Sequence, residues 1–430
     1  MTDLQNLSLS AMATRLRDGS ATASAIAEAC LARVEAREGT VGAWQYIDPE
    51  RVLEQAARRD NEAPSSALHG IPVGLKDIID TEDMPTTYGS PIYADHTPRK
   101  DTIMVQRLRA AGAVLIGKTV TTQFAHRFPG KTANPRNPAH TPGGSSSGSA
   151  AAVADNMTPL AFGTQTSGSV IRPAAYCGVI GFKPTFGWTD FTGAKNLAAS
   201  LDTLGYYVRS LDDLPMVHGV LSSDALPGPE TTDIAAPNFA LCRTPVWDQA
   251  DECAQATMET TAERLSSAGA GIRKFDLDAS FARVFDAQDT VLQYEMARHL
   301  KTERTENWDL IAPPTQEFIT RGEECSEEKI AEARYVFDQA RTDFAKALGD
   351  DIAITLSAPG EAPKGLEATG NALFNRMWTA LHVPCLHLPV DTGPQGLPLG
   401  VTLVARKGHE QRLVAAGRWA ATALALPLFG

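Results

Sequence analysis

The sequence lacks the patterns that mark secreted, membrane-spanning and metal-binding proteins. Its six cysteines are scattered and form no CxxC pair, which favours reduced thiols over a disulfide framework. No stretch approaches the roughly 20 apolar residues that a membrane-spanning helix needs, and the first residues lack the basic and apolar segments of a signal peptide. The nine histidines form no HExxH or HxH pattern. We therefore expect a cytoplasmic protein with no metal and no cofactor.

Positive charge is also in short supply. Lys and Arg total 39 against 51 Asp and Glu, which gives a formal net charge of −12, and no basic run reverses this balance locally. An acidic surface argues against direct binding of nucleic acid or of an anionic membrane. Apolar residues make up 43% of the 430 residues, an ordinary share for a globular protein with a large buried core.

Helical and strand-like periodicity alternate along the chain, which predicts an α/β protein with a largely internal sheet. The expected helices are two within 8–37 that are separated at 18–20, one opened by Asp48-Pro49, 101–111 capped by Asp101, 150–154, 326–348 and one from Glu410 onward. The expected strands are 42–47, 113–116, 351–356, 385–390 and 400–404.

No internal repeat divides the chain, so we expect a single domain over residues 1–430. Within it, residues of about 68–215 form the core, about 222–350 a variable middle and 351–430 a return to α/β alternation. The Pro/Gly/Asp-rich stretch 222–237 is expected to be a surface excursion.

The segment TPGGSSSGSAAAVA (141–154) places a turn rich in Gly and Ser directly before a small-residue helix. A flexible linker seldom leads straight into a buried helix, and a phosphate-binding loop would end in Gly-Lys-Ser/Thr, which is absent. The letters GSSSG also fit the GxSxG nucleophile elbow, with Ser146 as nucleophile. That elbow needs a buried strand before it, and the preceding TANPRNPAHTP contains three prolines, so this interpretation fails.

A second turn of the same kind lies in GTQTSGSVIRPAAYCG (163–178). Tight turns of this kind can direct consecutive backbone N–H groups into one cavity, which is what an oxyanion hole requires. Ser169, at the end of the turn, is a candidate nucleophile if a base lies nearby. The alternative is an ordinary Gly/Ser turn without a catalytic role.

Lys76, in GIPVGLKDIID, is the candidate base. Apolar neighbours on both sides predict that it is buried, and burial lowers the pKa of a lysine because it disfavours the charged form. A neutral amine can accept a proton from a serine. The alternative is a buried ion pair with Asp77 or Asp80. No histidine has comparable surroundings, and we expect His126 and His140 to make polar contacts near the loops.

Taken together, the three segments resemble the amidase signature family in order and spacing, and the last runs on into CGVIGFKPT. The stretch SLDTLGYYVRSLDDL (200–214) and the C-terminal GNALFNRMWTALHVPCLHLPV and GLPLGVTLVAR resemble later landmarks of that family. The resemblance covers most of the chain and is weakest over about 222–350. It implies a large central mixed β-sheet covered by helices on both faces, and an enzyme that hydrolyses linear amides.

Carried over residue by residue, the resemblance implies a Ser-Ser-Lys triad. Ser169 is the nucleophile, Ser145 the bridging serine and Lys76 the base, with a cis peptide bond between Gly144 and Ser145. The implied oxyanion hole consists of the backbone N–H groups of Thr166, Ser167, Gly168 and Ser169. The expected supporting residues are Gly144, Ser146, Gln165 and Arg172, while Ser147 and Ser149 are expected to be structural.

The turn departs from the common family form, which is Asp-x-Gly-Gly-Ser. Gln165 replaces the acidic residue and so removes a charge near the site, and Ser167 replaces a glycine. Arg172 sits one place later than usual, with Ile171 at the usual place. We interpret these differences as variation within a subgroup, because the three proton-handling residues are present.

The favoured function is hydrolysis of a small amide to a carboxylate and ammonia or an amine through an acyl-enzyme. The alternatives are the glutamine-hydrolysing A subunit of a tRNA-dependent amidotransferase, for which the chain is short, and a catalytically silent binding protein. Arg127 and Phe128 are candidate substrate contacts because they fall between the lysine motif and the serine loop. An arginine there is suited to a substrate carboxylate, and the alternative is an ordinary surface arginine. Family resemblance also suggests a homodimer.

Overall fold

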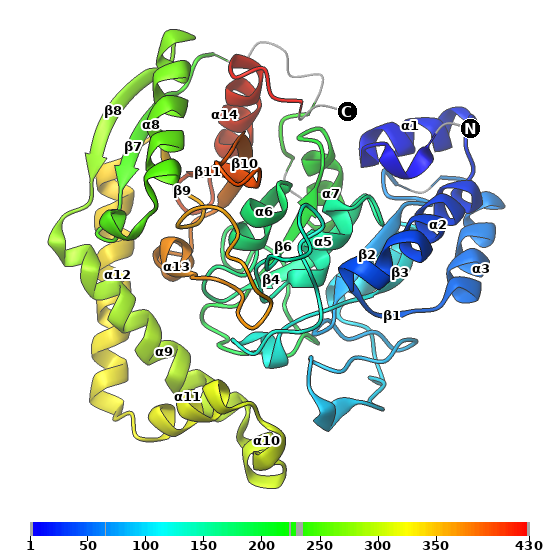
Figure 1. The fold of residues 1–430 in the computed structure, drawn as a ribbon, viewed down its shortest axis with the longest axis horizontal. Coiled ribbons are helices and arrows are strands. Elements are labelled where there is room, and N and C mark those ends of the chain that lie inside the picture. Colours follow the sequence, from blue (N-terminus) through cyan, green and yellow to red (C-terminus); the bar gives the residue numbers. More distant parts are fainter. Residues whose placement is uncertain (1–2, 65, 223–224, 229–234, 428–430) are drawn as a thin grey trace.

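One eleven-stranded sheet organises the computed structural model, which describes residues 3–64, 66–222, 225–228 and 235–427 (Figure 1). The strand order is β1-β3-β2-β4-β6-β5-β10-β11-β9-β7-β8. The strands are β1 Trp44–Ile47, β2 Pro72–Lys76, β3 Val114–Thr119, β4 Leu160–Gln165, β5 Ile180–Lys183, β6 Thr203–Val208, β7 Asn238–Arg243, β8 Gly271–Asp276, β9 Ile352–Leu356, β10 Cys385–Thr392 and β11 Pro398–Val404.

The sheet is mixed, as expected. β2 runs parallel to both β3 and β4, and β7 runs parallel to β8 and β9. The central strands β4, β6, β5, β10, β11 and β9 pair antiparallel in that order, and β1 is antiparallel to β3 at one edge. The predicted fold class, a large central mixed sheet with helices on both faces, is therefore confirmed.

The helices follow their capping signals closely. The side chain of Asp48 accepts a hydrogen bond from the N–H of Arg51, so α3 begins at Pro49 as expected. Gly42 ends α2 in a left-handed conformation, which moves the start of the next strand from residue 42 to Trp44. The helices are α1 Leu9–Asp18, α2 Ala23–Val41, α3 Pro49–Asp60, α4 Ile103–Ala110, α5 Ser147–Ala154, α6 Ile171–Cys177, α7 Asp213–Leu221, α8 Glu252–Ser267, α9 Arg283–His299, α10 Lys301–Glu306, α11 Pro313–Glu323, α12 Glu327–Leu348, α13 Leu373–Ala380 and α14 Glu410–Ala423.

One expected cap was wrong. The hydroxyl of Thr102, not Asp101, accepts the hydrogen bond from the N–H of Val105 at the start of α4. The carboxylate of Asp101 instead pairs with Arg109 at 2.7 Å. A one-residue error of this kind is expected where two capping residues stand side by side, since either side chain can serve.

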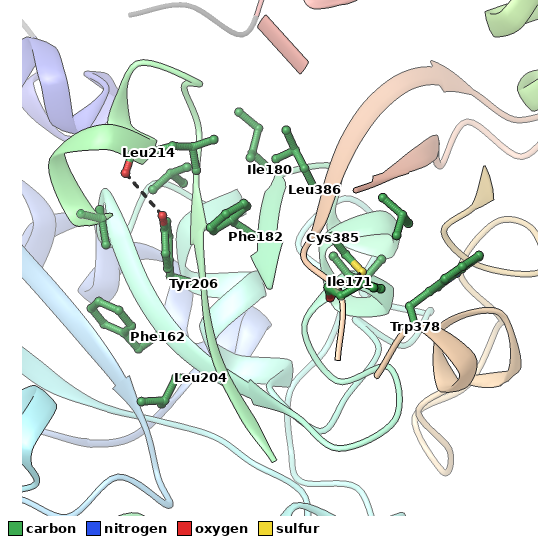
Figure 2. Packing of buried hydrophobic residues seen from close by; sticks show 14 of the residues in the cluster. Phe162, Ile171, Ile180, Phe182, Leu204, Tyr206, Leu214, Trp378, Cys385 and Leu386 are labelled. Atoms are coloured by element: carbon green, nitrogen blue, oxygen red, sulfur yellow. Dashed lines mark hydrogen bonds between the residues drawn. The ribbon is translucent and has the colours of Figure 1, made fainter. Parts of the chain in front are cut away.

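The two faces of the sheet centre pack against different helices. Phe162, Tyr206, Phe182 and Leu386 are directly paired across β4, β6, β5 and β10, so they share one face (Figure 2). There the hydroxyl of Tyr206 donates to the carbonyl oxygen of Leu214 in α7. The opposite face packs against α5 and α6 through a cluster that includes Ala150, Val153, Ala161, Val170, Ala174 and Tyr207. This second cluster fixes both helices that begin at the two Gly/Ser turns.

The middle of the chain contributes both strands and helices. β7 and β8 extend the sheet, while α9 packs against α11 and α12 in an arm at the left of Figure 1, far from α1–α3 at the right. Of the expected surface excursion 222–237, residues 223–224 and 229–234 lie outside the described residues. Among the described helices, none combines the length and apolarity that crossing a membrane would require.

Candidate active site

The parallel pairing of β2 and β4 brings two of the three sequence motifs together. Leu75 is in register with Phe162, so Lys76 at the end of β2 lies beside the end of β4. The carboxyl ends of parallel strands meet at the same edge of a sheet. The turn 166–170, which follows β4 and leads into α6, therefore starts close to the lysine.

Lys76 is fully buried, and its Nζ lies 2.7 Å from Oγ of Ser145 and 2.7 Å from Oγ1 of Thr164. Burial lowers the pKa of Lys76 to about 7, while the carboxyl group of Asp202 acts in the opposite direction. Nζ donates to both hydroxyl oxygens, and in its neutral form the amine also has a lone pair that can accept a proton.

The alternative of a buried ion pair is contradicted by the contacts of the two carboxylates. Asp77 accepts hydrogen bonds from the backbone and hydroxyl of Thr87, and Asp80 accepts one from the hydroxyl of Tyr88. Among the described residues, no salt bridge involves Lys76. The lysine thus faces hydroxyl groups rather than a carboxylate.

The peptide bond between Gly144 and Ser145 is cis, as the resemblance implies. The carbonyl oxygen of Gly144 accepts a hydrogen bond from Nη2 of Arg172 at 2.5 Å. A methyl group added at Gly144 would lie 2.6 Å from Cγ2 of Thr369, closer than non-bonded carbons approach. Arg172 thus binds this peptide group, and Thr369 packs closely against Gly144.

Ser146 binds the backbone of a neighbouring strand. Its hydroxyl donates to the carbonyl oxygen of Thr164 and accepts from the N–H of Thr164, both at 3.2 Å. These bonds tie the start of α5 to β4, the strand that carries the hydroxyl next to Lys76. Ser146 makes no hydrogen bond to Lys76 within the described residues.

The turn before Ser169 has hydrogen-bonded carbonyl oxygens, while its N–H groups make no hydrogen bond among the described residues. Each carbonyl oxygen from Thr166 to Ser169 accepts a hydrogen bond, from Gln288, Thr379, Arg172 and Tyr207 in turn. Among the hydrogen bonds of the described residues, none uses the backbone N–H of Thr166, Ser167, Gly168 or Ser169. Four consecutive N–H groups thus remain available while the backbone that carries them is fixed.

Gln165 organises this turn through both halves of its amide. Its Oε1 accepts from the N–H groups of Val170 at 2.9 Å and Ile171 at 3.0 Å, and its Nε2 donates to Oγ1 of Thr379 at 3.0 Å. A carboxylate would reproduce the two accepting bonds but has no hydrogen to donate to Thr379. Gln165 therefore lacks the negative charge of the acidic residue common in the family, but it supplies a hydrogen-bond donor that a carboxylate lacks.

Replacing Gln165 with leucine is expected to lower kcat by about 10- to 100-fold and the free energy of unfolding by about 1–3 kcal/mol, because two buried N–H groups lose their acceptor. Steady-state kinetics and urea unfolding measure the two effects. Gln165→Glu should restore most of the kcat, since it keeps the accepting oxygens. Equal losses in both variants would contradict this role for the side-chain oxygen.

Ser169 lines a cavity of about 380 Å³ and is itself 7% exposed. The other residues that line the cavity are Ala125, His126, Arg127, Thr166, Ser167, Arg172, Leu197, Asp289, Leu292, Ala368, Thr369, Gly370, Asn371, Ala372 and Arg376. In the described part of the chain, Oγ of Ser169 has no hydrogen-bond partner, so no direct bond joins it to Ser145. Its hydroxyl is thus free to approach a molecule in the cavity.

The two candidate substrate contacts differ in position. Arg127 lines the cavity and stacks over the ring of Phe318, with its Cζ 4.4 Å from the ring centroid. Phe128 is 49% exposed and is not among the residues that line the cavity, so its expected substrate contact is not supported. Among the described residues, no three His, Cys, Asp or Glu side chains gather as a metal site would require.

Sequence reasoning missed Asp202, although SLDTLG was noted as a landmark. Its buried carboxylate accepts from Oγ1 of Thr166 at 2.5 Å and from the N–H groups of Leu197 and Ala198. Burial raises the pKa of Asp202 to about 7, against the effect of these hydrogen bonds and of Lys76. Asp202 thus binds the turn through Thr166 and also raises the pKa of Lys76.

Gln288 of α9 was missed as well. Its Nε2 donates to the carbonyl oxygen of Thr166 at 3.2 Å and to Oγ of Ser167 at 2.8 Å, and its Oε1 accepts from Arg376. No motif marks this glutamine in the sequence. The variable middle of the chain therefore helps to hold the turn.

A family model matches most of the chain, and a curated relative matches about half of it. A family model described as Amidase matches residues 25–414. The A subunit of glutamyl-tRNA(Gln) amidotransferase from Chloroflexus aggregans is 40% identical over 250 residues, which cover 54% of this chain and 51% of that relative. The matched segment thus spans about half the length of the curated relative.

Two solved structures match nearly the full length. A crystal structure of an amidase has a TM-score of 0.88 and 27% identity, and the match covers 97% of this chain and 99% of that one. Native peptide amidase from Stenotrophomonas maltophilia has a TM-score of 0.83 and 26% identity, with coverage of 98% and 97%. The fold of this chain therefore recurs in solved amidase structures.

Proposed function

The chain belongs to the amidase family of hydrolases, which act on C–N bonds, and from this premise we propose that Ser169, Ser145 and Lys76 hydrolyse the amide bond of a small substrate. The observation that carries the proposal is the contact between the buried Lys76 and Ser145, beside a turn whose four N–H groups have no acceptor among the residues that the structure describes. A serine nucleophile needs a base and a site for the oxyanion. The Lys76–Ser145 contact supports the first requirement, and the N–H groups of the turn support the second.

The proposed reaction begins when Oγ of Ser169 attacks the amide carbonyl carbon. The proton of Ser169 passes to Ser145 as Ser145 passes its own to neutral Lys76. The carbonyl oxygen takes up negative charge against the N–H groups of the turn. Because an amide ion is a very poor leaving group, the relay then returns the proton to the leaving nitrogen as the C–N bond breaks.

The second half of the reaction releases the acyl group. A water molecule attacks the ester formed on Ser169 and gives one proton to the relay, which returns it to Oγ of Ser169 as the carboxylic acid leaves; the acid then loses its own proton to solvent. The proton transfer between Ser169 and Ser145 needs these hydroxyls in contact. Hydrogen bonds of this kind are often long in a free enzyme and close when the substrate binds.

A second candidate is the glutamine-hydrolysing A subunit of an amidotransferase that passes ammonia to a partner chain. The relatives at 40% identity favour it, since they carry that name. The two structures that match over nearly the full chain favour a free-standing amidase. A catalytically silent protein has no need of a buried lysine whose pKa is lowered next to a serine.

Release of ammonia from a panel of small amides, glutamine included, separates these candidates. We expect the purified protein alone to hydrolyse at least one amide other than glutamine. Activity confined to glutamine would favour the amidotransferase subunit instead. No hydrolysis of any member, together with no reaction of Ser169 with a fluorophosphonate, would contradict a hydrolase. Light scattering of the same sample tests the homodimer.

A further inference from the structure

Arg127 is the guanidinium group of the cavity with no acceptor among the described residues. It lines the same cavity as Ser169, yet no hydrogen bond or ion pair to it occurs in the described part of the chain. Its contact with the ring of Phe318 occupies one face of the guanidinium plane. Arg127 is exposed, so the N–H groups at the edge of that plane are accessible to an anion that enters the cavity.

The other charged groups of the cavity already have partners. Asp289 pairs with Arg376 at 2.6 Å. Arg172 donates to the carbonyl oxygens of Gly370 and Gly144 and to Oγ1 of Thr369. These interactions fix the loops around the cleft and leave neither arginine with its full set of donors free.

His126 adds no charge to the cavity wall. His126 is buried, its Nδ1 lies 3.0 Å from Oγ1 of Thr315, and burial lowers its pKa to about 3. The cavity wall therefore carries three guanidinium groups and one carboxylate. This excess of positive charge occurs in a protein whose formal net charge is −12, so it is local to the cavity.

The loop that carries Arg127 is held from both sides. The side chain of Gln123 donates to the carbonyl oxygen of Leu310 and accepts from the N–H of Ala312. Phe124 and Ala125 have φ values of 51° and 59°, a left-handed conformation that non-glycine residues seldom adopt. The hydroxyl of Thr122 donates to the carbonyl oxygen of His126. Arg127 thus projects from a fixed loop.

We propose that the cavity takes an amide that also carries a carboxylate, and that Arg127 binds this carboxylate while Ser169 attacks the amide carbonyl. The inference rests on the proposed function of Ser169. A planar guanidinium with free edge donors matches the two oxygens of a carboxylate. A cavity of about 380 Å³ suits a small molecule rather than a long chain.

Protection of Ser169 from a covalent probe tests this inference without knowledge of the true substrate. The rate of fluorophosphonate labelling at Ser169 is followed by mass spectrometry in the presence of glutarate, 1,5-pentanediol or inorganic phosphate. For the wild type we expect glutarate to slow labelling at lower concentration than the diol or phosphate. In Arg127→Ala, the glutarate concentration for half-protection should rise about 10- to 100-fold, the loss expected for a charge-assisted pair.

Two further variants sharpen the experiment. Arg127→Lys keeps the charge but loses the two-point contact, so it should fall between the wild type and Arg127→Ala. Arg243→Ala is the matched control, because Arg243 also stacks on an aromatic ring, that of Trp247, but lies outside the cavity. Its ratio of labelling rates with and without glutarate should equal that of the wild type.

The outcomes distinguish failure of the carboxylate inference from failure of the proposed function of Ser169. Three results would overturn the carboxylate inference alone. Glutarate does not slow labelling at Ser169, the diol or phosphate slows it equally well, or glutarate slows it equally in Arg127→Ala. Absence of any labelling at Ser169 would overturn the proposed function and this inference with it.

Discussion

Ser169→Ala is expected to lower kcat for amide hydrolysis at least about 1000-fold, because the variant has no nucleophile to form the acyl-enzyme. Stability should change by less than about 1 kcal/mol, since the hydroxyl loses no hydrogen bond that the described residues provide. Ammonia release measures the first effect and urea unfolding the second. A loss of activity without a loss of folding would place the hydroxyl in the chemical step.

Ser147→Ala is the matched control for this substitution. Ser147 is a buried serine of the neighbouring Gly/Ser turn, and its hydroxyl donates to the carbonyl oxygen of Ser145 at a long 3.4 Å. We expect it to retain kcat within about 10-fold of the wild type, since a weak neutral hydrogen bond contributes about 1 kcal/mol. Activity that survives in Ser169→Ala would remove Ser169 from the proposed mechanism.

Local signals in the sequence predicted two of the helices, but not the strands β2, β4 and β6 around the site. Asp48-Pro49 opens α3, and the expected helix 150–154 lies within α5, which begins earlier, at Ser147. Spacing and apolar flanks also predicted that Lys76 is buried, and the structure places it against Ser145. These features depend on residues close together in the chain, where capping and burial patterns act.

The remaining features depend on contacts between distant segments. Gln288 reaches Thr166 across 122 residues, and its place on α9 carries no signal that separates it from any polar residue on a packed helix. Asp202 lies in a recognisable stretch, but its bond to Thr166 exists only once β6 pairs with β4. Strand pairing of this kind is set by the whole sheet, so one sequence cannot assign these partners.

The pH dependence of kcat/KM is expected to show an acidic limb near pH 7. The pKa of Lys76 is lowered to about 7, so protonated Lys76 predominates below that pH and cannot accept a proton from Ser145. The neutral base gains population as the pH rises, and the rate should therefore increase and then level off. Initial rates at substrate concentrations well below KM, measured from pH 5 to pH 9, give this profile.

Lys76→Met is expected to lower kcat at least about 1000-fold and to remove the acidic limb from any residual activity, because the variant has no base that titrates there. Methionine has a similar length, so the substitution avoids an empty cavity beside Ser145. The unfolding midpoint checks that the variant is folded. A residual activity with an unchanged limb would assign that limb to another group.

Asp202 is the group that most needs to be separated from Lys76, since burial raises its pKa to about 7 and the two groups interact. The carboxylate of Asp202 raises the pKa of Lys76, so its removal in Asp202→Asn should lower that pKa further. If Lys76 is the base, the acidic limb therefore moves to lower pH in this variant. If the limb reflects ionisation of Asp202 itself, it disappears. A shift of the acidic limb to lower pH would therefore assign it to Lys76, and loss of the limb would assign it to Asp202.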